Sequence, residues 1–525
     1  MVIVKRALLS CYDKTGLDLL ARELAACKAE LIASGGTAEF LQQHGIHLKT
    51  VEEFAGAAEQ LDGRVKTLHP KIHAGILARR DNPSHVSSVG EHGLIDLVVV
   101  NLYPFEETIQ RPGISLEEAI EQIDIGGVAL LRAAAKNFAH VAVVSNPSQY
   151  QAVADALARG KGELPESLAR ELAVTAFHLT SRYDAWIANY LGASATPLRR
   201  TPAGALWWAS ADQATVSIML RKQQALRYGE NPHQRGTWYV PAAGPSWGLA
   251  TLQQLQGKEL SYNNLLDVDA AFRCLLDCEA PTCAIIKHHA QCGMASAETV
   301  REAYERAYAC DAESAFGGVV GFNRAVGAEL AERLTATFLE VVVAPAIEPE
   351  ALPIFQKKSN LRVVTLQWPK AAPDEPEWRH LSGTWLLQAA DRLACSASAM
   401  KIATARPPTE RERDDLLFAW TAVKHLKSNG VVLVQDRATV GIGQGQPSRV
   451  GSVRLAIEKA GGRSRGAVAA SDGFFPFPDG VELLARAGVT AVIQPGGSIR
   501  DAEVIEAANR SNLAMALTGI RHFRH

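Results

Sequence analysis

The chain has 525 residues, of which 47% are apolar and 21% are charged, and 54 basic against 56 acidic side chains leave a formal net charge of −2. This balance gives no electrostatic reason to expect nucleic acid or a membrane surface as the main partner. The length predicts about two to four domains. The first residues lack an apolar stretch long enough for a signal peptide, and no run approaches the ~20 apolar residues of a membrane helix, so we expect a cytoplasmic protein.

Short apolar runs alternate with helical patterns over the first part of the chain, which is typical of an α/β fold. Runs this apolar indicate strands that helices cover on both faces. The expected strands are Ala7–Ser10, Leu31–Ala33, Leu97–Val100 and Val141–Val144, and the expected helices are Leu17–Lys28, Thr37–His44 and Val128–Asn137.

A segment rich in Thr, Pro, Ser and Gly, residues 192–205, is typical of a linker. We therefore predict one domain over residues 1–195 and another over residues 200–525. The second is again α/β and long enough for two subdomains, and we find no short-period repeat. Its expected strands are Cys283–Ile286, Val431–Val434, Val489–Ile493 and Leu513–Leu517.

Five of the eight cysteines fall between Cys274 and Cys310, close to His288 and His289, so a zinc site has to be weighed. Their spacing is not a pair of CxxC knuckles, and no HxE faces a PCxxC. We expect buried free thiols and no catalytic metal.

Three polar loops follow the N-terminal strands, and ligands of open α/β sheets bind beyond the carboxyl ends of the strands. The loops are residues 10–16, 34–37 and 101–105. Ser34-Gly35-Gly36-Thr37 runs into a helix N-terminus, where free N–H groups and the helix dipole favour a phosphate, and Lys14 adds a positive charge. The competing interpretation is a tight turn with a helix cap.

Two further segments are rich in cations or in glycine. Residues 63–70 contain Arg64, Lys66 and His69, and the helix after Asp124-Ile125-Gly126-Gly127 carries Lys136. Such groups bind phosphates and oxyanions. The alternatives are a solvated surface loop and an exposed cationic helix end.

These segments resemble the cyclohydrolase half of the bifunctional purine-biosynthesis family. The matching motifs are SCYDKTG, LIASGGTAEFL, GRVKTLHPKIHAGILARR, NLYPF and EQIDIGGVALLRAAAKN. The resemblance implies a methylglyoxal-synthase-like, doubly wound parallel sheet that holds a nucleotide phosphate around Ser10, Lys14, Ser34, Gly35, Gly36 and Thr37. It also implies that Lys66, Tyr103, Asp124 and Lys136 surround the reacting groups. We add Arg64, Thr67, Asn101, Gly126 and Gly127 to the expected substrate-binding residues.

Ring closure of formyl-AICAR fits these residue types. The carboxamide nitrogen attacks the formyl carbon and water leaves, so a cation is needed where the carbonyl oxygen becomes negative. Acid–base groups must handle the nitrogen proton and the departing hydroxyl. Lys66 and Lys136 suit the first task, and Asp124 and Tyr103 suit orientation and proton handling.

A second candidate centre is Lys287-His288-His289, directly after an expected strand. Formyl transfer to a weakly nucleophilic amine needs a base, for which His288 is suited, and a cation at the formyl oxygen, for which Lys287 is suited. A lone histidine here would more simply be structural. Phe474 and Phe475 are either core or a platform for a flat ring such as pterin. The glycine run at 441–445 lacks the Lys-Ser/Thr ending of a phosphate-binding P-loop.

Residues ~200–525 resemble the AICAR transformylase half of the same family, through LRYGENPHQ, LSYNNLLD, SAFGG, KSN, GIGQGQPSR and SDGFFPF. The resemblance implies a pair of cytidine-deaminase-like α/β subdomains without zinc, a homodimer and a possible monovalent cation. It implies Lys287 and His288 as the catalytic pair with Asn429 assisting, and 10-formyltetrahydrofolate against Phe474, Phe475 and Pro476. The implied nucleotide contacts are Arg227, Tyr228, His233, Asn264, Gly317, Arg449 and Arg521.

One departure concerns the catalytic pair. The family usually continues with Ala-Asn-Pro-Cys-Gly, whereas this chain has His289-Ala290-Gln291-Cys292-Gly293. His289 therefore competes with His288 for the role of base. We favour His288 because it matches the position in the motif.

The sequence thus predicts a bifunctional enzyme that formylates AICAR and then closes the ring to inosine monophosphate. One alternative is an enzyme with a single working half, and another is a non-enzymatic nucleotide sensor. The presence of Lys14, Lys66, Tyr103, Asp124 and Lys136 argues against the first. A sensor would not need Lys287 and His288 at a strand end.

Overall fold

The computed structural model describes all residues except 62, 110, 112, 194–214, 216, 243–246 and 370–375, with residues 91, 192 and 193 described in their backbone only. The described residues form two compact units, one within residues 1–199 and one within residues 218–525. The expected linker at 192–205 lies almost wholly outside the described residues, so the boundaries at 195 and 200 stay predictions.

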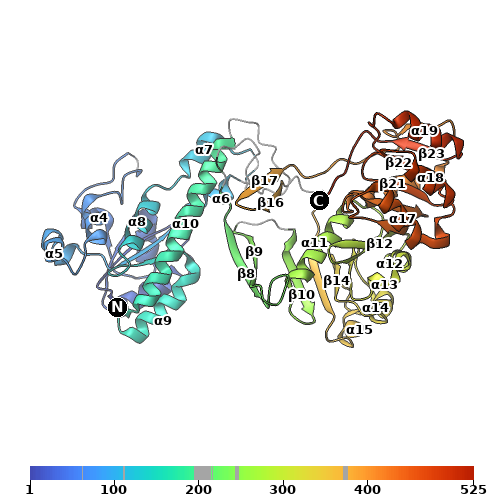
Figure 1. Cartoon of the computed structure of the whole chain (residues 1–525). Coiled ribbons are helices and arrows are strands. Elements are labelled where there is room, and N and C mark those ends of the chain that lie inside the picture. Colours follow the sequence, from blue (N-terminus) through green and yellow to red (C-terminus); the bar gives the residue numbers. More distant parts are fainter. Residues whose placement is uncertain are drawn as a thin grey trace. The chain divides into compact units, whose positions relative to one another are not determined.

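The first unit is built on a parallel five-stranded sheet of order β4-β3-β2-β5-β6 (Figure 1). The strands expected in this part lie within two residues of the observed ones, because each is a short apolar run that is buried in the sheet. The strands are β2 Arg6–Cys11, β3 Glu30–Ala33, β4 Lys49–Thr50, β5 Leu97–Asn101 and β6 Ala142–Val144, and β1 Val2–Ile3 pairs separately with β7 Glu163–Leu164.

Helices pack around this sheet, with α8 against α10 and α1 against α9. The helices are α1 Leu17–Ala26, α2 Gly35–Gln43, α3 Val51–Ala55, α4 Pro70–Leu77, α5 Pro83–Val89, α6 Phe105–Thr108, α7 Leu116–Glu121, α8 Gly126–Lys136, α9 Tyr150–Gly160 and α10 Glu166–Ala193, with short turns at η1 Glu91–Gly93 and η2 Pro147–Gln149. Helix α2 begins at Gly35 rather than at Thr37, because Ser34 is the last extended residue, with φ −102° and ψ 142°. Both glycines therefore form the first helical turn.

The second unit contains a mixed twelve-stranded sheet of order β10-β15-β14-β13-β11-β12-β20-β19-β21-β22-β23-β18. Its four expected strands are confirmed within two residues. The strands are β10 Gly248–Gln256, β11 Thr282–Lys287, β12 Ala290–Ser296, β13 Val319–Phe322, β14 Val341–Ala344, β15 Arg362–Gln367, β18 Lys401–Ile402, β19 Val431–Gln435, β20 Ala438–Gly443, β21 Val468–Ser471, β22 Ala491–Gln494 and β23 Ala514–Leu517. The helices are α11 Tyr262–Leu276, α12 Val300–Cys310, α13 Ala312–Ala315, α14 Ala328–Thr335, α15 Leu352–Gln356, α16 Glu410–Lys424, α17 Arg449–Ala460, α18 Asp479–Arg486 and α19 Asp501–Arg510, with a short turn at η3 Gly461–Ser464.

This sheet consists of two sets of strands with the same arrangement. In each set a hairpin, β11–β12 or β19–β20, is followed by one antiparallel neighbour and then by two parallel strands. The sets meet where β12 pairs with β20 through Ala295 and Ala438. The second unit is therefore internally duplicated, and the repeated element is a whole subdomain rather than a short motif.

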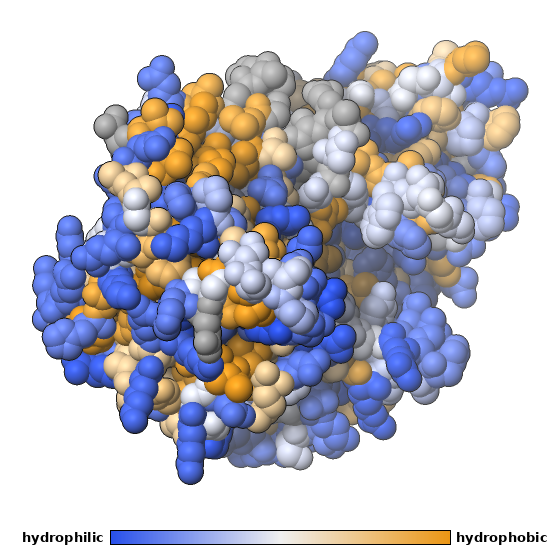
Figure 2. All heavy atoms as spheres, turned by 90° about the vertical axis from the view of Figure 1, so that its left-hand side faces the viewer, coloured by the Kyte–Doolittle hydropathy of each residue, from blue (hydrophilic) through white to orange (hydrophobic). Residues whose placement is uncertain are grey.

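Two hairpins stand apart from the large sheet, β8 Leu220–Leu226 with β9 Gly236–Pro241, and β16 Glu377–Leu381 with β17 Thr384–Gln388. Trp385 and Leu386 of β17 are exposed. The face in Figure 2 is mostly hydrophilic, with hydrophobic patches among the polar side chains. Among the described residues, no helix combines the length and apolar character that crossing a membrane requires. All eight cysteines are free thiols; five are buried, and Cys27, Cys278 and Cys395 are half-buried.

Candidate functional site

A cavity of about 780 Å³, the first cavity, opens at the carboxyl ends of β2, β3 and β5 in the first unit. This is the edge of the sheet at which the three polar loops were expected to meet. Fourteen predicted site residues line the cavity: Ser10, Lys14, Ser34, Gly35, Gly36, Thr37, Arg64, Lys66, Thr67, Asn101, Tyr103, Asp124, Gly126 and Gly127.

The N-terminus of α2 faces this cavity without a side-chain cap. The Ser34 hydroxyl makes no capping bond and instead lies 2.8 Å from the hydroxyl of Ser10. A Cβ atom on Gly35 would lie 3.0 Å from Nζ of Lys66, and one on Gly36 would lie 4.0 Å from Nζ of Lys14. Two ammonium groups thus meet a helix N-terminus whose first N–H groups have no side-chain acceptor, which is an arrangement suited to a phosphate.

Thr37 and Asn101 hold the loop after β2 in place. The Thr37 hydroxyl accepts from the backbone N–H of Cys11 at 2.9 Å and lies 3.1 Å from its carbonyl oxygen. The Asn101 amide accepts from the N–H of Asp13 at 2.8 Å and donates to its carbonyl at 2.7 Å. These side chains position the cavity wall, since their polar atoms are already paired with the backbone.

The residues expected around the reacting groups lie on other walls of the same cavity. Burial raises the pKa of Asp124, although its carboxylate accepts from the N–H of Gly127 at 2.7 Å. The ring of Tyr103 meets that of Tyr12 edge-on, with centroids 5.5 Å apart. The Lys66 ammonium lies 2.5 Å from the carboxylate of Glu59, a partner that the sequence analysis missed.

Lys136 does not line the cavity. It is the last residue of α8, whose first residues Gly126 and Gly127 are in the cavity wall, and it is exposed. A rise of ~1.5 Å per residue puts the two helix ends about 15 Å apart. The geometry therefore separates Lys136 from Lys66, Tyr103 and Asp124, with which it was expected to act.

In the second unit, Lys287, His288 and His289 lie at the turn between β11 and β12. The Lys287 ammonium donates to the carbonyl oxygen of Phe316 at 2.8 Å, which brings it to the loop that contains Gly317. His288 is exposed and His289 is half-buried. Burial lowers the pKa of His289, and the charges of Arg524 and Lys427 lower it further, so its imidazole is neutral at pH 7.

The carboxylate of Asp267 on α11 accepts hydrogen bonds from the backbone N–H groups of His288 and His289. Asp267 ends the LSYNNLLD motif, but the motif itself did not predict this contact. Asn263 lies about one helix turn before Asp267 in α11, and its amide donates to the carbonyl of Glu230 at 3.2 Å. Asn264 completes the capping box of α11 with Ser261.

A second cavity, of about 450 Å³, is lined by five predicted residues together with neighbours that include Phe477 and Phe523. The five are Asn429, Arg449, Phe474, Phe475 and Pro476. The Phe475 ring is 1% exposed and belongs to the core, whereas Phe474 is 38% exposed. Phe475 is therefore a core residue. Phe474 remains available to stack on a flat ring.

Arg449 is buried and engaged within the protein. Its guanidinium donates to the Ser471 hydroxyl at 2.7 Å and to the Asn429 amide oxygen at 2.8 Å, and it forms an ion pair with Asp472. Arg449 therefore fixes Asn429 in the cavity wall. The other residues expected on this side do not line the described cavities, namely Arg227, Tyr228, His233, Asn264, Lys287, His288, Gly317 and Arg521. The Arg521 guanidinium does lie 4.3 Å from the ring centre of Phe523, which lines the second cavity.

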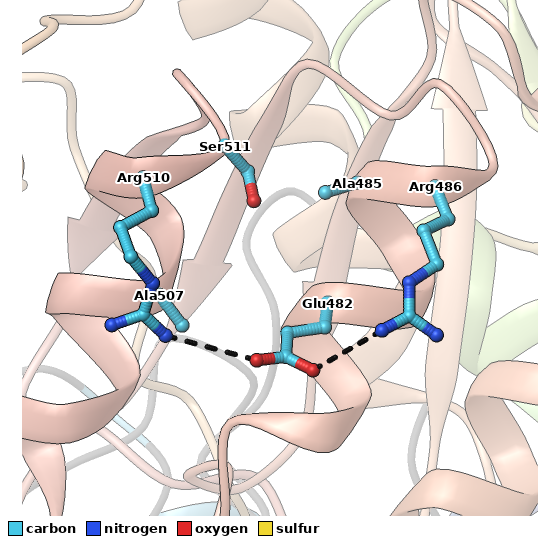
Figure 3. A pocket seen from close by; sticks show the side chains of 6 residues that line it. All are labelled: Glu482, Ala485, Arg486, Ala507, Arg510 and Ser511. Atoms are coloured by element: carbon cyan, nitrogen blue, oxygen red, sulfur yellow. Dashed lines mark hydrogen bonds and ion pairs between the residues drawn. The ribbon is translucent and has the colours of Figure 1, made fainter.

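A third cavity, of about 340 Å³, lies between α18 and α19 (Figure 3). In it Glu482 pairs with Arg486 at 3.4 Å and with Arg510 at 3.7 Å. The three charged side chains pair with one another at the protein surface. No predicted site residue lines this third cavity. Among the described residues, no group of three or more His, Cys, Asp or Glu is placed to hold a metal ion.

The sequence model of a family described as "AICARFT/IMPCHase bienzyme" matches residues 134–459, and that of an "MGS-like domain" matches residues 16–129. Proteins named "Bifunctional purine biosynthesis protein PurH" match along their whole length. The one from Trichodesmium erythraeum is 49% identical, with 99% of each chain covered. Those from Synechococcus elongatus and Nostoc punctiforme are each 48% identical, over 99% and 100% of both chains respectively. A solved structure titled "Crystal structure of ForH" is 36% identical over 36% of this chain and 97% of its own, with a TM-score of 0.34.

Proposed function

This chain belongs to the AICARFT/IMPCHase bienzyme family, and from that membership we propose which of its residues carry the two reactions. The protein is a bifunctional enzyme of purine biosynthesis, an AICAR transformylase and IMP cyclohydrolase that uses a folate formyl donor. Its N-terminal part is an MGS-like domain. We assign cyclisation to residues 1–195 and formyl transfer to residues 200–525.

Cyclisation takes place in the first cavity. The observation that carries this assignment is the meeting of Lys14 and Lys66 at the uncapped N-terminus of α2. The nucleotide phosphate binds the N–H groups of α2 and Lys14, and Lys66 stabilises the oxyanion that forms as the carboxamide nitrogen attacks the formyl carbon.

Asp124 and Tyr103 handle the protons of the cyclisation. Burial raises the pKa of Asp124, which brings its carboxyl closer to the range in which it exchanges protons with a substrate nitrogen or a departing hydroxyl. The backbone N–H groups of Gly127 and Tyr103 hydrogen-bond to this carboxylate and so fix its position in the cavity wall. Tyr103 orients the ring from the neighbouring wall.

Formyl transfer uses the turn after β11. His288 takes the proton of the AICAR amine, Lys287 stabilises the oxyanion on the formyl carbon, and Asn429 assists. The donor is 10-formyltetrahydrofolate, whose pterin ring stacks on Phe474 in the second cavity, beside Pro476. The nucleotide is bound by Arg227, Tyr228, His233, Asn264, Gly317 and Arg521, and Arg449 acts by holding Asn429.

The enzyme acts as a cytoplasmic homodimer in which a second copy completes the transformylase site. Two features support this. His288 of the proposed catalytic pair is exposed, and the separate β16–β17 hairpin exposes Trp385 and Leu386, which a second copy would cover. From the family membership we also propose that a monovalent cation binds in the second unit. Sedimentation should give a dimer mass, and a monomer at micromolar concentration would overturn the dimer proposal.

The assignment of the two reactions is tested by following tetrahydrofolate and inosine monophosphate separately after AICAR and 10-formyltetrahydrofolate are mixed with the full chain. Lys66→Met should form tetrahydrofolate at the normal rate but accumulate formyl-AICAR. His288→Ala should form neither product from AICAR yet cyclise added formyl-AICAR normally, and His289→Ala should retain formyl transfer. Loss of both reactions in either of the first two variants would contradict the separation of the sites.

A further inference from the structure

The turn that carries the histidines has an unusual backbone. His288 and His289 have φ values of +53° and +60°, which is the left-handed region that residues with a side chain rarely adopt. Two-residue hairpin turns of this kind normally contain Asn-Gly or Asp-Gly. Here two histidines occupy both positions, so the rest of the structure has to hold the turn in place.

Asp267 supplies this support from outside the hairpin. Its Oδ2 accepts from the N–H of His288 at 3.2 Å and its Oδ1 accepts from the N–H of His289 at 2.6 Å. One carboxylate on α11 thus binds both N–H groups that the turn leaves without a partner in the β-ladder. Such bonds to a charged acceptor are stronger than bonds between neutral groups.

In the second set of strands, an aspartate also binds the two backbone N–H groups of a hairpin turn. Asp415 on α16 accepts from the N–H groups of Asp436 and Arg437 at 3.0 and 2.6 Å, and these residues have φ values of +52° and +56°. Both hairpins also carry the same register shift, after Ile285 in one and after Leu433 in the other. The carboxylate clamp therefore belongs to the duplicated fold, and the two copies differ in the side chains that the turn presents.

We propose that Asp267 is a positioning residue for formyl transfer, which it serves by fixing the turn that directs the side chains of Lys287 and His288; this rests on the proposed function of those two residues. At the far end of the Lys287 side chain, the ammonium donates to the Phe316 carbonyl. A shift of the turn would move the ammonium and the imidazole together, and misplacement of reacting groups by about 1 Å can cost as much as 100-fold in rate. Asp415 binds the backbone N–H groups of the other turn in the same way, and that turn contains no Lys or His. Asp415 is therefore the matched control.

The charge of Asp267 has a separate consequence. The charged groups around the turn are Asp267 and Asp269 on α11, Lys287 in the hairpin, Lys427 before β19 and Arg524 near the C-terminus. The two aspartates favour a protonated imidazole, and Lys427 and Arg524 disfavour it. Removal of the Asp267 charge should therefore lower the pKa of His289 further.

The experiment compares Asp267→Asn, Asp267→Glu and Asp415→Asn in the full chain. Asp267→Asn should lower kcat of formyl transfer by about tenfold or more with less than about threefold change in the KM for AICAR. Asp267→Glu keeps the charge but moves the carboxylate by one methylene, so kcat should fall in this variant as well, which separates the position of the carboxylate from its charge. Asp415→Asn should change neither kcat nor this KM.

Each variant also reports on its own folding. The rate of cyclisation of added formyl-AICAR should match that of the unaltered chain in all three, and Asp267→Asn and Asp415→Asn should both lower the midpoint of thermal unfolding, because each removes a carboxylate that binds two backbone N–H groups. Equal losses of formyl transfer in Asp267→Asn and Asp415→Asn, or an unchanged kcat in both Asp267 variants, would overturn the proposal. An unchanged kcat in His288→Ala would instead remove the proposed role of the turn itself, which separates the two failures.

Discussion

The ammonium of Lys66 lies 2.5 Å from the carboxylate of Glu59 and faces the first cavity, so the group assigned to the oxyanion has an anionic partner within the protein. A substrate oxygen that becomes negative must compete with Glu59 for this ammonium. The Glu59 side chain is largely exposed and the pair is reached by water, so the competition is weak in energy. Glu59 therefore tunes the site rather than blocking it.

Removal of the Glu59 charge should speed cyclisation. We expect Glu59→Gln to raise kcat for cyclisation by about threefold, because Lys66 is then available to the developing oxyanion, and to leave the free energy of unfolding within ~0.5 kcal/mol. Lys66→Met should lower kcat for cyclisation by about 100-fold, equivalent to ~2.7 kcal/mol. Steady-state cyclisation assays check both, and a higher KM in Glu59→Gln would show that Glu59 binds substrate instead.

Gly127 is needed for the placement of Asp124. A Cβ atom on Gly127 would lie 2.5 Å from Oδ2 of Asp124 and 2.9 Å from a methyl carbon of Leu102, so both neighbours would have to move. We expect Gly127→Ala to lower kcat for cyclisation by about tenfold, since the displaced carboxylate no longer meets the substrate. Gly160→Ala is the control, because Gly160 ends α9, does not line the cavity, and its Cβ would meet only Cβ of Glu163 at an ordinary 3.6 Å. Equal kcat values in the two variants would contradict this role of Gly127.

Lys136 should be dispensable for cyclisation, against the expectation from the family motif. It lies at the exposed C-terminal end of α8, about 15 Å along the helix from the glycines that line the cavity. Lys136→Ala should therefore keep kcat for cyclisation within about threefold of the unaltered enzyme, whereas Lys66→Met should not. A loss in Lys136→Ala as large as that in Lys66→Met would restore Lys136 to the site.

Much of the first site was predictable because short apolar strands fix where β2, β3 and β5 end, and the polar loops follow directly. Glu59 was not predictable, since its approach to Lys66 depends on how the loop between them folds back through the bridge of Gln60 with Val65. Asp267 and Asp415 were missed for a related reason. Their carboxylates reach hairpins that lie about twenty residues further along the chain, and the duplication that relates them shows in strand order rather than in short sequence motifs.

Phe474 and Phe475 of the second cavity should have different roles, the first in folate binding and the second in stability. Phe474→Ala should raise the KM for 10-formyltetrahydrofolate by about tenfold, because a lost stacking contact costs roughly 1 kcal/mol, and it should destabilise the fold less than Phe475→Ala does, because Phe474 is 38% exposed. Phe475→Ala should lower the free energy of unfolding by about 3–5 kcal/mol, because its ring is buried in the core. Chemical denaturation and folate titration separate the two, and the reverse pattern would place Phe475 at the pterin.

A buried cluster at the ends of α11 and α16 should make stability depend on pH. Nε2 of His425 lies 2.8 Å from Oδ2 of Asp277, and Nζ of Lys424 lies 3.0 Å from the same oxygen. Burial lowers the pKa of His425 despite this carboxylate, so the imidazole is neutral in the folded protein at pH 7. Burial opposes the charge of Asp277, but the bonds from His425 and Lys424 outweigh it and hold the pKa of Asp277 well below its usual value.

Because of His425 and Asp277, the free energy of unfolding should fall as the pH falls, and each group acts in a different pH range. In the unfolded chain His425 takes up a proton below its ordinary pKa of about 6.5, which the folded chain resists, so the free energy of unfolding should fall by ~1–2 kcal/mol between pH 7 and pH 5. The contribution of Asp277 is complete above its ordinary pKa of about 3.9 and is lost only below that. His425→Gln should flatten the change between pH 7 and pH 5. Denaturation curves at the two pH values test this, and an equal fall in His425→Gln would assign the change to another group.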